Sequence, residues 1–556
     1  MTNPDQEVHT YFSPFGNAQN ATYVTTRRIE NLKNEIKTFN IHKKKEVTPI
    51  ILISPEVGKL PKSAGEFAPY ISGKSGGLGE VVCSLHSGLK KLGLLTYLIT
   101  GGFERRFLEE AKIDKYEFMK KRHSLDHGNI KLVSSPLFSD KWDAYDGNEE
   151  ENAAEFQKLV VMNEIPEITS KYDGRGIICN HDWFSGGLIS AYANYMNLPS
   201  IFVNHNWHTR DIALDNLRGA GIGRLWDNLH INYDDNNKRK LRSAPTAIKN
   251  CSLNAHVGKE YLEEIMRGEF DDKIDFWYKH ETCLKNLYGK NIILPNGISP
   301  EMYPENQRVN PNVNEPGLAK SFSENSRDII EAKKANLLKF QQKTGLKTNP
   351  DAILFFWASR LDPTQKGIQI AEKVVGKFAY DNPDVQFAFI GNGVGGDKTH
   401  ENILGKIACS SNGQICSYPF NDDLSILAYA ACDDSFGCSL YEPFGLNDVG
   451  GNLCGATATN RDTGGYHDKI KTLRLKSLGA TRDHGNGFLF KNYDEGGLWY
   501  GLNTSLNMHR YLNLNLKEKE TQLKRIIRET KEKHSQEEMT ASYLAAFEKI
   551  NGKPLI

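Results

Sequence analysis

A turn of glycines around one lysine, Lys74-Ser75-Gly76-Gly77-Leu78-Gly79-Glu80, carries the first residues whose types and spacing suggest chemistry. Glycines let the backbone turn sharply and approach a ligand closely, because no Cβ stands in the way. The apolar helical pattern at 78–92 follows, and the N-terminus of a helix favours an anion through its free N–H groups and its dipole. The turn is therefore a candidate phosphate-binding loop, and its pattern alone also fits an ordinary turn.

Polar and charged residues follow the ends of several strand-like runs. Those in the first half of the chain are His181-Asp182-Trp183, His205-Asn206 and Asn296-Gly297. Those in the second half are Ser359-Arg360, Gln365-Lys366-Gly367, Gly391-Asn392-Gly393, Tyr441-Glu442 and Thr463-Gly464-Gly465. Open α/β sheets bind ligands beyond the carboxyl ends of their strands. We therefore expect these cations, carboxylates, imidazoles and glycines to surround one ligand-binding cleft.

The charged members of this set suggest how a ligand would be held. Arg360, Lys366 and Lys74 could hold a diphosphate without a metal ion, because such cations stabilise charge that develops on a leaving phosphate. Glu442 is suited to accept hydrogen bonds from sugar hydroxyls, and Gly445-Leu446 could donate backbone N–H groups to the phosphates. The sequence has no Asp-rich cluster typical of a magnesium site, so we expect neither a metal nor another cofactor.

The elements that must position these residues alternate between buried-strand runs and helical patterns. The strand runs of the first half are 49–54, 95–100, 130–134, 159–162, 176–180, 200–204 and 291–295. Those of the second half are 352–359, 385–390, 414–418, 434–439 and 487–490. Such alternation favours parallel sheets with helices on both faces. We predict an α/β fold in which two such units face each other across a cleft.

These patterns divide the chain into five segments. We expect an N-terminal extension at 1–45, a Rossmann-like domain at 46–303, a linker at 304–326, a second Rossmann-like domain at 327–530, and a C-terminal helix at 531–556 that packs back on the first domain. The linker is rich in Pro, Asn, Ser and Glu. One interpretation of 55–72, an insertion just before the glycine-rich turn, is a lid over the cleft.

Composition excludes several classes of protein. The 556 residues are 39% hydrophobic and 25% charged, as in a soluble globular enzyme. Because 69 Lys and Arg balance 69 Asp and Glu, no overall field would recruit nucleic acid or an anionic membrane. The nine cysteines form no Cys-x-x-Cys pair, which indicates reduced thiols. Without a secretory signal or a membrane-spanning run, we expect a cytoplasmic protein, and its oligomeric state stays open.

Several of these motifs, in this order and spacing, resemble the bacterial glycogen synthase and plant starch synthase family over residues 48–500. They are Lys-Ser-Gly-Gly-Leu-Gly-Glu (74–80), His-Asp-Trp (181–183), Asn-His-Asn (204–206), Pro-Asn-Gly-Ile (295–298), Ser-Arg-Leu-Asp with Gln-Lys-Gly (359–367) and Glu-Pro-Phe-Gly-Leu (442–446). The resemblance implies a GT-B fold, which is two Rossmann-like domains facing a deep cleft. It also implies metal-independent transfer of glucose, with retention of configuration, from ADP-glucose or UDP-glucose to an α-1,4-glucan.

The resemblance also implies residue roles. Catalysis would involve His205 and Asp182 near the donor sugar, Arg360 and Lys366 at the phosphates, and Glu442 on the sugar. The nucleotide-sugar site would comprise Lys74, Gly76, Gly77, Glu80, Gly391, Tyr418, Gly445, Leu446, Thr463 and Gly464. Trp183 and Asn296 would lie on the acceptor side. The expected partners are a nucleotide-sugar donor and a glucan or another hydroxyl acceptor.

The chain departs from the family pattern in places. Phe444, Asn447 and Asp448 replace the usual Cys, Thr and Gln, and 207–243 lacks the usual acceptor-side pattern. Asn254-Ala255-His256 stands where Thr-Val-Ser is usual. The resemblance is thus better supported for the donor-binding half of the site than for the acceptor-binding half.

Three alternatives stay open. The acceptor could be a protein or a small molecule, or the protein could bind sugar nucleotides or glucan without catalysis. A P-loop nucleotidase is a third interpretation, because 68–75 misses the Walker pattern only by Ala68.

Overall fold

The computed structural model describes residues 47–73, 76–122, 125–234, 236–270, 281–286 and 288–556. The predicted extension at 1–45 lies outside these residues, as do Lys74 and Ser75. The chain divides into two compact units. Unit 1 comprises the chain up to Val257, together with Glu263–Ile298 and Gln536–Ile556, and unit 2 comprises Gly258–Leu262 and Ser299–Ser535.

Unit 1 is built on a sheet of seven parallel strands in the order β10-β9-β5-β4-β1-β2-β3. Their bounds are β1 (Ile50–Ile53), β2 (Thr96–Gly101), β3 (Ile130–Val133), β4 (Ile177–His181), β5 (Ser200–Asn204), β9 (Leu253–His256) and β10 (Asn291–Ile293). The order of the strands reverses between β1 and β4, as in a Rossmann fold, so the loops after these two strands flank the switch point where such folds bind ligands.

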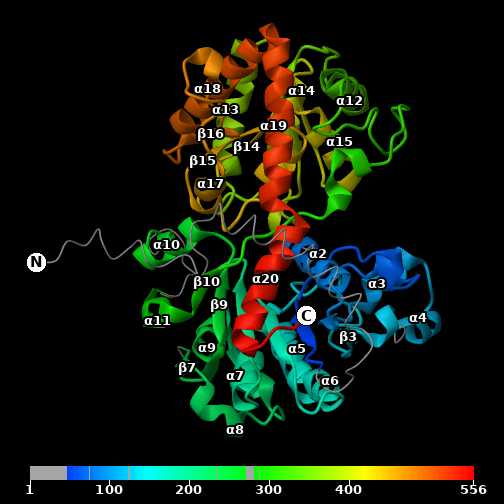
Figure 1. Cartoon of the computed structure of the whole chain (residues 1–556), viewed down its shortest axis with the longest axis vertical. Coiled ribbons are helices and arrows are strands. Elements are labelled where there is room, and N and C mark those ends of the chain that lie inside the picture. Colours follow the sequence, from blue (N-terminus) through cyan, green and yellow to red (C-terminus); the bar gives the residue numbers. More distant parts are fainter. Residues whose placement is uncertain (1–46, 74–75, 123–124, 235, 271–280, 287) are drawn as a thin grey trace, which may run out of the picture. The chain divides into compact units, whose positions relative to one another are not determined.

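Helices cover both faces of this sheet, and Figure 1 labels them. They are α2 (Gly77–Lys91), α3 (Glu104–Ala111), α4 (Lys115–Arg122), α5 (Glu149–Leu159), α6 (Ile165–Ser170), α7 (Gly187–Tyr195), α8 (Ile222–Leu225), α9 (Ser243–Asn250), α10 (Lys259–Arg267, of which the first residues belong to unit 2), α11 (Glu281–Asn286) and α20 (Gln536–Asn551). The C-terminal helix α20 packs on α2, where Gln536 Nε2 donates to the Ser84 carbonyl oxygen at 2.8 Å.

The predicted strand at 159–162 is wrong, because these residues are helical. Leu159 ends α5, and a π-helical turn, Val160–Glu164, connects α5 to α6. Asn148 caps the start of α5 by accepting the N–H groups of Glu150 and Glu151. The apolar run therefore continues a helix that begins upstream, and Val160 and Val161 are buried as part of one helical face.

The insertion at 55–72 packs within unit 1. It forms two short 3-10 helices, Lys62–Ala64 and Ala68–Tyr70, and the Phe67 ring contacts the Phe118 ring of α4 with centroids 5.5 Å apart. Phe67 is 4% exposed. Because Ala68–Tyr70 is a helical turn, the start of the Walker-like stretch does not form the open loop that a P-loop requires.

A small antiparallel sheet follows β5. Its strands are β6 (Asp211–Ala213), β7 (Ile231–Tyr233) and β8 (Arg239–Arg242), in the order β6-β8-β7. This sheet occupies the stretch 207–243 that departs from the family pattern. Sequence periodicity predicts none of these three strands, because each is only three or four residues long.

Unit 2 repeats the Rossmann arrangement with six parallel strands in the order β13-β12-β11-β14-β15-β16. Their bounds are β11 (Ile353–Trp357), β12 (Val385–Ile390), β13 (Ile415–Tyr418), β14 (Asp434–Gly437), β15 (Thr457–Arg461) and β16 (Gly487–Phe490). The order reverses between β11 and β14, so the loops after these strands flank the switch point of this sheet.

Eight helices pack around the sheet of unit 2 (Figure 1). They are α12 (Ile329–Thr344), α13 (Ile368–Asp381), α14 (Thr399–Ser410), α15 (Asp422–Ala431), α16 (Asn447–Leu453), α17 (Gly464–Lys469), α18 (Glu495–Leu514) and α19 (Leu516–His534). On one face the aromatic rings of Phe355, Phe387 and Phe436 pack together, with the last two centroids 5.5 Å apart. This apolar core holds β11, β12 and β14 in register.

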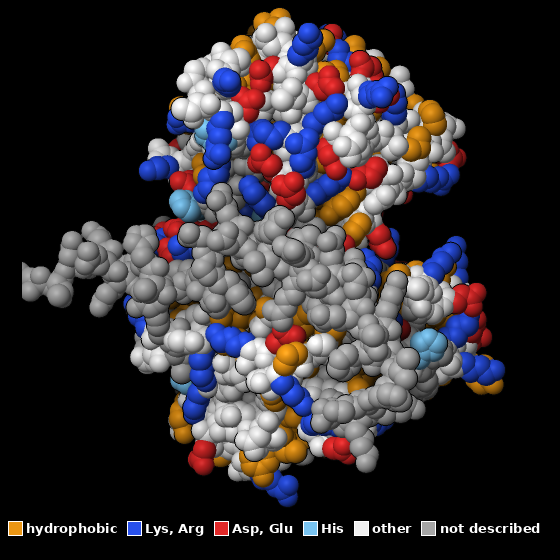
Figure 2. Space-filling model, viewed as in Figure 1, with side chains coloured by type: hydrophobic (Ala, Val, Ile, Leu, Met, Phe, Trp, Pro, Cys, Tyr) orange, Lys and Arg blue, Asp and Glu red, His pale blue; other side chains and the backbone are white. Residues whose placement is uncertain are grey.

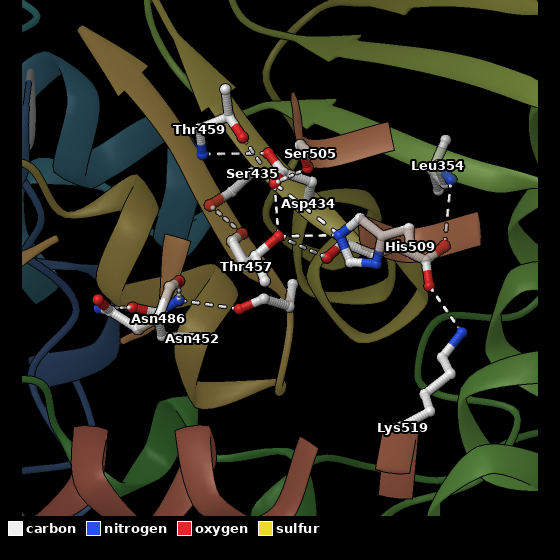
Figure 3. Close-up of polar contacts among 12 residues, drawn as sticks. Leu354, Asp434, Ser435, Asn452, Thr457, Thr459, Asn486, Ser505, His509 and Lys519 are labelled. Atoms are coloured by element: carbon white, nitrogen blue, oxygen red, sulfur yellow. Dashed lines mark hydrogen bonds and ion pairs between the residues drawn. The ribbon is translucent and has the colours of Figure 1, made fainter. Parts of the chain in front are cut away.

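A buried polar network joins β14, β15 and α18 at the opposite ends of these strands from the switch point (Figure 3). The Asp434 carboxylate accepts hydrogen bonds from the hydroxyls of Thr457, Thr459 (2.8 Å) and Ser505 (2.7 Å). Burial raises the pKa of Asp434 to about 6, against the lowering effect of these hydrogen bonds. Because its inward face is polar, β15 lacks the apolar pattern that would have predicted it.

On the described part of the face in Figure 2, side chains of both signs are interspersed. None of the helices that the structure describes is both long enough and apolar enough to cross a lipid bilayer.

Candidate functional site

The loop after β11 carries Arg360 and Lys366 and lies against the end of β14. Gly367 has a φ of +70°, and a Cβ there would lie 2.4 Å from the Cys438 carbonyl oxygen. The Leu440 N–H donates to the Gln365 carbonyl oxygen at 2.7 Å. The two loops that flank the switch point of unit 2 are therefore fastened to each other, and only glycine fits at position 367.

Lys366 and Glu442 form an ion pair between these loops. The Lys366 Nζ lies 2.6 Å from the Glu442 Oε2, and the Ser439 hydroxyl donates to the same oxygen at 3.1 Å. The two side chains are 13% and 6% exposed. Arg360 is exposed beside them, and its Nη2 donates to Gln365 Oε1 at 2.8 Å. Two cations and one carboxylate thus meet where a Rossmann sheet binds its ligand.

The loop at 442–446 is packed on the segment at 463–466 by glycines. Gly464 has a φ of +44°, and a Cβ there would lie 2.1 Å from the Glu442 carbonyl oxygen. The Gly465 N–H donates to that same oxygen at 2.8 Å. Gly445 has a φ of +81° and lies against the Tyr466 ring. Thr463 is the N-cap residue of α17. The sequence-predicted residues Glu442, Gly445, Thr463 and Gly464 are therefore brought together.

The three residues that depart from the family pattern in this loop have partners of their own. Asn447 accepts the Tyr466 hydroxyl at 2.7 Å. Asp448 lies 2.7 Å from the ammonium of Lys469, and the Phe444 ring lies beneath that ammonium at 4.2 Å. Sequence analysis did not identify Lys469, because the family motif gives no reason for a lysine there.

Gly391 and Tyr418 lie at the ends of β12 and β13. The Gly391 N–H donates to the Tyr418 carbonyl oxygen at 3.1 Å, and a Cβ on Gly391 would lie 2.1 Å from the Ser359 carbonyl oxygen. Gly391 is thus next to the loop of Arg360. The Tyr418 hydroxyl instead donates to the Thr344 carbonyl oxygen at 3.1 Å, at the end of α12.

In unit 1, the carboxylate of Glu56 lies at the start of α2. Its Oε2 accepts the N–H of Gly76, the N-cap residue of α2, at 2.8 Å, and its Oε1 accepts the Tyr145 hydroxyl at 3.0 Å. Glu56 is 5% exposed. Gly77 is the first residue of α2, and Glu80 lies in its first turn. Glu56 was missed, although its position just after β1, beyond a strand end, was the available signal.

Asp182 follows β4 on the other side of this switch point. It has a φ of +57°, uncommon for a residue with a side chain, and its Oδ1 accepts the N–H of His205 at 2.6 Å and that of Asn206 at 3.1 Å. Burial raises the pKa of Asp182 to about 7, although these two hydrogen bonds lower it. Asp182 therefore positions the loop that carries His205.

His205 is paired with a second histidine. Its Nε2 lies 2.9 Å from the Nδ1 of His181, the last residue of β4. Burial lowers the pKa of His205 to about 3, and burial together with His205 lowers the pKa of His181 well below its usual value. Both rings are neutral at neutral pH, so one ring donates an N–H to the other.

The acceptor-side residues are buried. Trp183 is 3% exposed, and its ring contacts those of Phe184 and His208. Asn296 is 6% exposed, and its Oδ1 has no hydrogen-bond partner among the described residues. Among the residues that depart from the family pattern, the Trp207 ring stacks on the His256 ring with centroids 5.6 Å apart.

Comparisons with known proteins find glycogen synthases and a starch synthase domain. The model of the starch synthase catalytic domain family matches residues 63–280. A glycogen synthase of Geobacillus thermodenitrificans is 23% identical over 473 residues, covering 81% of this chain and 90% of that protein. A glycogen synthase of Thermotoga maritima is 24% identical and covers 78% of this chain and 89% of that protein.

Solved structures give the fold. The catalytic domain of starch synthase IV from Arabidopsis thaliana matches with a TM-score of 0.66 at 18% identity, covering 91% of this chain and 98% of that chain. A sucrose-phosphate synthase from Thermosynechococcus elongatus matches with a TM-score of 0.55 at 14% identity, covering 91% of this chain and 99% of that one.

Two Rossmann-like units, with charged residues and glycines at their switch points, give the chain the GT-B fold. The family model and the curated relatives make the chain similar to the glycogen synthases and starch synthases, a similarity that supports a glycosyltransferase.

Proposed function

We propose that the chain transfers glucose from ADP-glucose or UDP-glucose to an α-1,4-glucan, with retention of configuration and without a metal ion. One observation carries this proposal. The paired Lys366 and Glu442, with Arg360 beside them, lie at the switch point of unit 2. Their chemistry fits a sugar diphosphate, because the cations suit its phosphates and the carboxylate suits its hydroxyls.

On the donor side, Arg360 and Lys366 would take up the charge that develops as the nucleoside diphosphate leaves. Glu442 would exchange its partner Lys366 for sugar hydroxyls once the phosphates engage the ammonium. The Arabidopsis starch synthase IV catalytic domain was solved with ADP and acarbose bound, which supports a nucleoside diphosphate as part of the donor.

Near the donor sugar, His205 and Asp182 would orient the reactants. A neutral His205 can donate or accept a hydrogen bond, but it carries no charge that would compete with the phosphate cations. The acceptor hydroxyl would approach the face from which the diphosphate leaves and give its proton to the departing phosphate oxygen. In this mechanism the protein mainly holds the reactants in position.

The test is incubation of the purified protein with ADP-[14C]glucose or UDP-[14C]glucose, with and without glycogen. We expect radioactivity in the precipitated glucan with at least one donor, and we expect Glu442→Gln to lower it about 100-fold. Hydrolysis of the donor without extension of glycogen would overturn the glucan acceptor. No turnover of either donor, with a correctly folded protein, would overturn the proposal as a whole.

A second candidate keeps the donor chemistry but uses a protein or a small molecule as acceptor. The observation in its favour is that the acceptor-side departures form structure of their own, namely the sheet β6-β8-β7 and the stack of Trp207 on His256. Transfer of label to a fraction other than glycogen, at a rate that glycogen does not increase, would favour this candidate.

A further inference from the structure

Lys469, the last residue of α17, is a buried cation whose hydrogen-bond and ion-pair partners lie where the loop after β14 meets the start of α16. Its side chain is 5% exposed. Its Nζ donates to the Gly445 carbonyl oxygen, lies 2.7 Å from Asp448 Oδ1, and sits 4.2 Å from the centroid of the Phe444 ring. A buried ammonium is unfavourable unless it is paired and hydrogen-bonded. Its hydrogen-bond and ion-pair partners, Gly445 and Asp448, both lie within residues 444–448.

The carboxylate partner is as deeply buried as the ammonium. The Asp448 side chain is 1% exposed, and its Oδ2 has no hydrogen-bond partner in the part of the chain that the structure describes. Burial raises the pKa of Asp448 to about 6 and lowers the pKa of Lys469, and the ion pair opposes both shifts. An apolar pair would fill this space without that penalty, so the charge points to a role beyond packing.

The geometry of the peptide between Gly445 and Leu446 suggests that role. In a trans peptide the C=O and the following N–H point in opposite directions. Because Lys469 holds the Gly445 C=O, the N–H of Leu446 points away from Lys469. Gly445, with a φ of +81°, tolerates a rotated peptide far better than any other residue would, so its own conformation does not fix the orientation.

Helix α17 is held near both of its ends. Near its start, the Gly465 N–H donates to the Glu442 carbonyl oxygen at 2.8 Å, and near its end, the Asp468 carboxylate accepts the N–H of Lys259 at 2.7 Å. Because of these contacts, α17 presents Lys469 to the loop from a rigid support.

We infer that Lys469 is a positioning residue, which holds the Gly445–Leu446 peptide so that the Leu446 N–H donates to the diphosphate of the donor. The inference rests on the proposed function and assigns to it a residue that does not touch the substrate. The site it serves takes a nucleoside diphosphate or its sugar ester.

The test compares Lys469→Met with a matched control, Lys333→Met. Lys333 is also 5% exposed, donates to the carbonyl oxygens of Ala430 and Cys454, and has its Nζ 5.6 Å from the Phe322 ring centroid. Both substitutions remove a buried ammonium from carbonyl partners in unit 2. Only Lys469 contacts the loop at 442–448.

Calorimetric titration with ADP and UDP gives the affinity, and thermal unfolding verifies the fold of each variant. We expect Lys469→Met to weaken binding of the nucleoside diphosphate roughly tenfold or more, the effect of losing one hydrogen bond to a charged group. Lys333→Met should bind within about twofold of the original protein, because its site is remote. Lys469→Arg, which keeps the charge and a donor, should retain most of the affinity.

Unchanged affinity in folded Lys469→Met, or an equal loss in Lys333→Met, would overturn the inference. If Lys469→Met does not fold, Lys469→Gln keeps a shorter neutral donor and provides the same comparison. Failure of the original protein to bind ADP or UDP would overturn the proposed function itself, so the two failures are distinct.

Discussion

At the scale of single residues, the site depends on charged groups whose partners are within the same unit. The Glu442 carboxylate has Lys366 and Ser439 as partners, and Asp182 holds two backbone N–H groups. The residue types were predictable because sugar hydroxyls and phosphates require carboxylates and cations. The pairing of Lys366 with Glu442 was not predictable, because the two residues are 76 positions apart in the chain.

Glu442→Gln is expected to lower kcat/KM for the donor about 100-fold, in the range seen when one hydrogen-bonding group is lost from a transition state. Glutamine keeps the shape but removes the negative charge. The matched control is Glu372→Gln, because Glu372, on α13, pairs with His400 Nδ1 of α14 at 2.9 Å, away from the loop at 442–446. Steady-state kinetics should show a loss of kcat/KM in Glu442→Gln and not in Glu372→Gln. Equal rates in the two variants would contradict the role assigned to Glu442.

Asp182→Asn should change how stability depends on pH. Burial raises the pKa of Asp182 to about 7 from its ordinary value of 3.8, so between these values the native state binds more protons than the unfolded state. The contribution of Asp182 to the free energy of unfolding therefore falls as pH rises through that window, by at most about 4 kcal/mol. Asparagine does not titrate and can still accept both N–H groups.

The measurement is the thermal midpoint of both proteins at pH 5 and pH 8. The midpoint of Asp182→Asn minus that of the original protein should become more positive at pH 8. The buried histidines contribute equally to both proteins and cancel in this difference. A difference that is independent of pH would show that Asp182 is already ionised at pH 5.

At the scale of elements, close approach between loops decides where the site residues stand. Gly367, Gly445 and Gly464 all have positive φ values and lie against backbone or a ring of the neighbouring loop. Predicted element types were mostly right where runs are apolar, as in β1, β5 and β12. They failed at 159–162, where a helix that begins upstream continues through a strand-like run, and at β15, whose buried hydroxyls bind Asp434.

Gly445→Ala should displace the loop at 442–446 in addition to straining the backbone at position 445. A Cβ there would lie 2.5 Å from the Tyr466 ring, whereas Gly345, with a similar φ of +72°, has open space around it. Both alanine variants carry a strain of about 1–2 kcal/mol from the left-handed backbone. We expect only Gly445→Ala to lose donor affinity as well, measured by titration with ADP or UDP, and unaltered affinity would show that the ring can shift without moving the loop.

At the scale of the whole molecule, the same strand order occurs in two sheets, and in each sheet a charged residue follows each of the two strands at which the order reverses. Glu56 and Asp182 flank the switch point of unit 1, and Arg360 and Glu442 flank that of unit 2. A nucleoside diphosphate that binds only the native protein raises its unfolding midpoint.

Titration with ADP, UDP and GDP, followed by thermal shift, should therefore identify the base of the donor. At 100 times the dissociation constant the stabilisation is about 2.7 kcal/mol. The shift should persist in EDTA, because Arg360 and Lys366 supply the positive charge, and it should be lost in Lys366→Met. A shift that requires added magnesium would contradict the metal-independent mechanism.

The sequence by itself determined the α/β class, the two tandem units and the residue types at the strand ends, because strand and helix periodicity and turn chemistry are local. It also showed the resemblance to the glycogen and starch synthases, through motifs that are each contiguous in the chain. Only the tertiary structure decided which residues support those motifs. Lys469, Asp448 and Glu56 act through contacts between segments distant in the chain or through burial, and the desolvation that makes Asp182 hard to ionise exists only once the chain has packed.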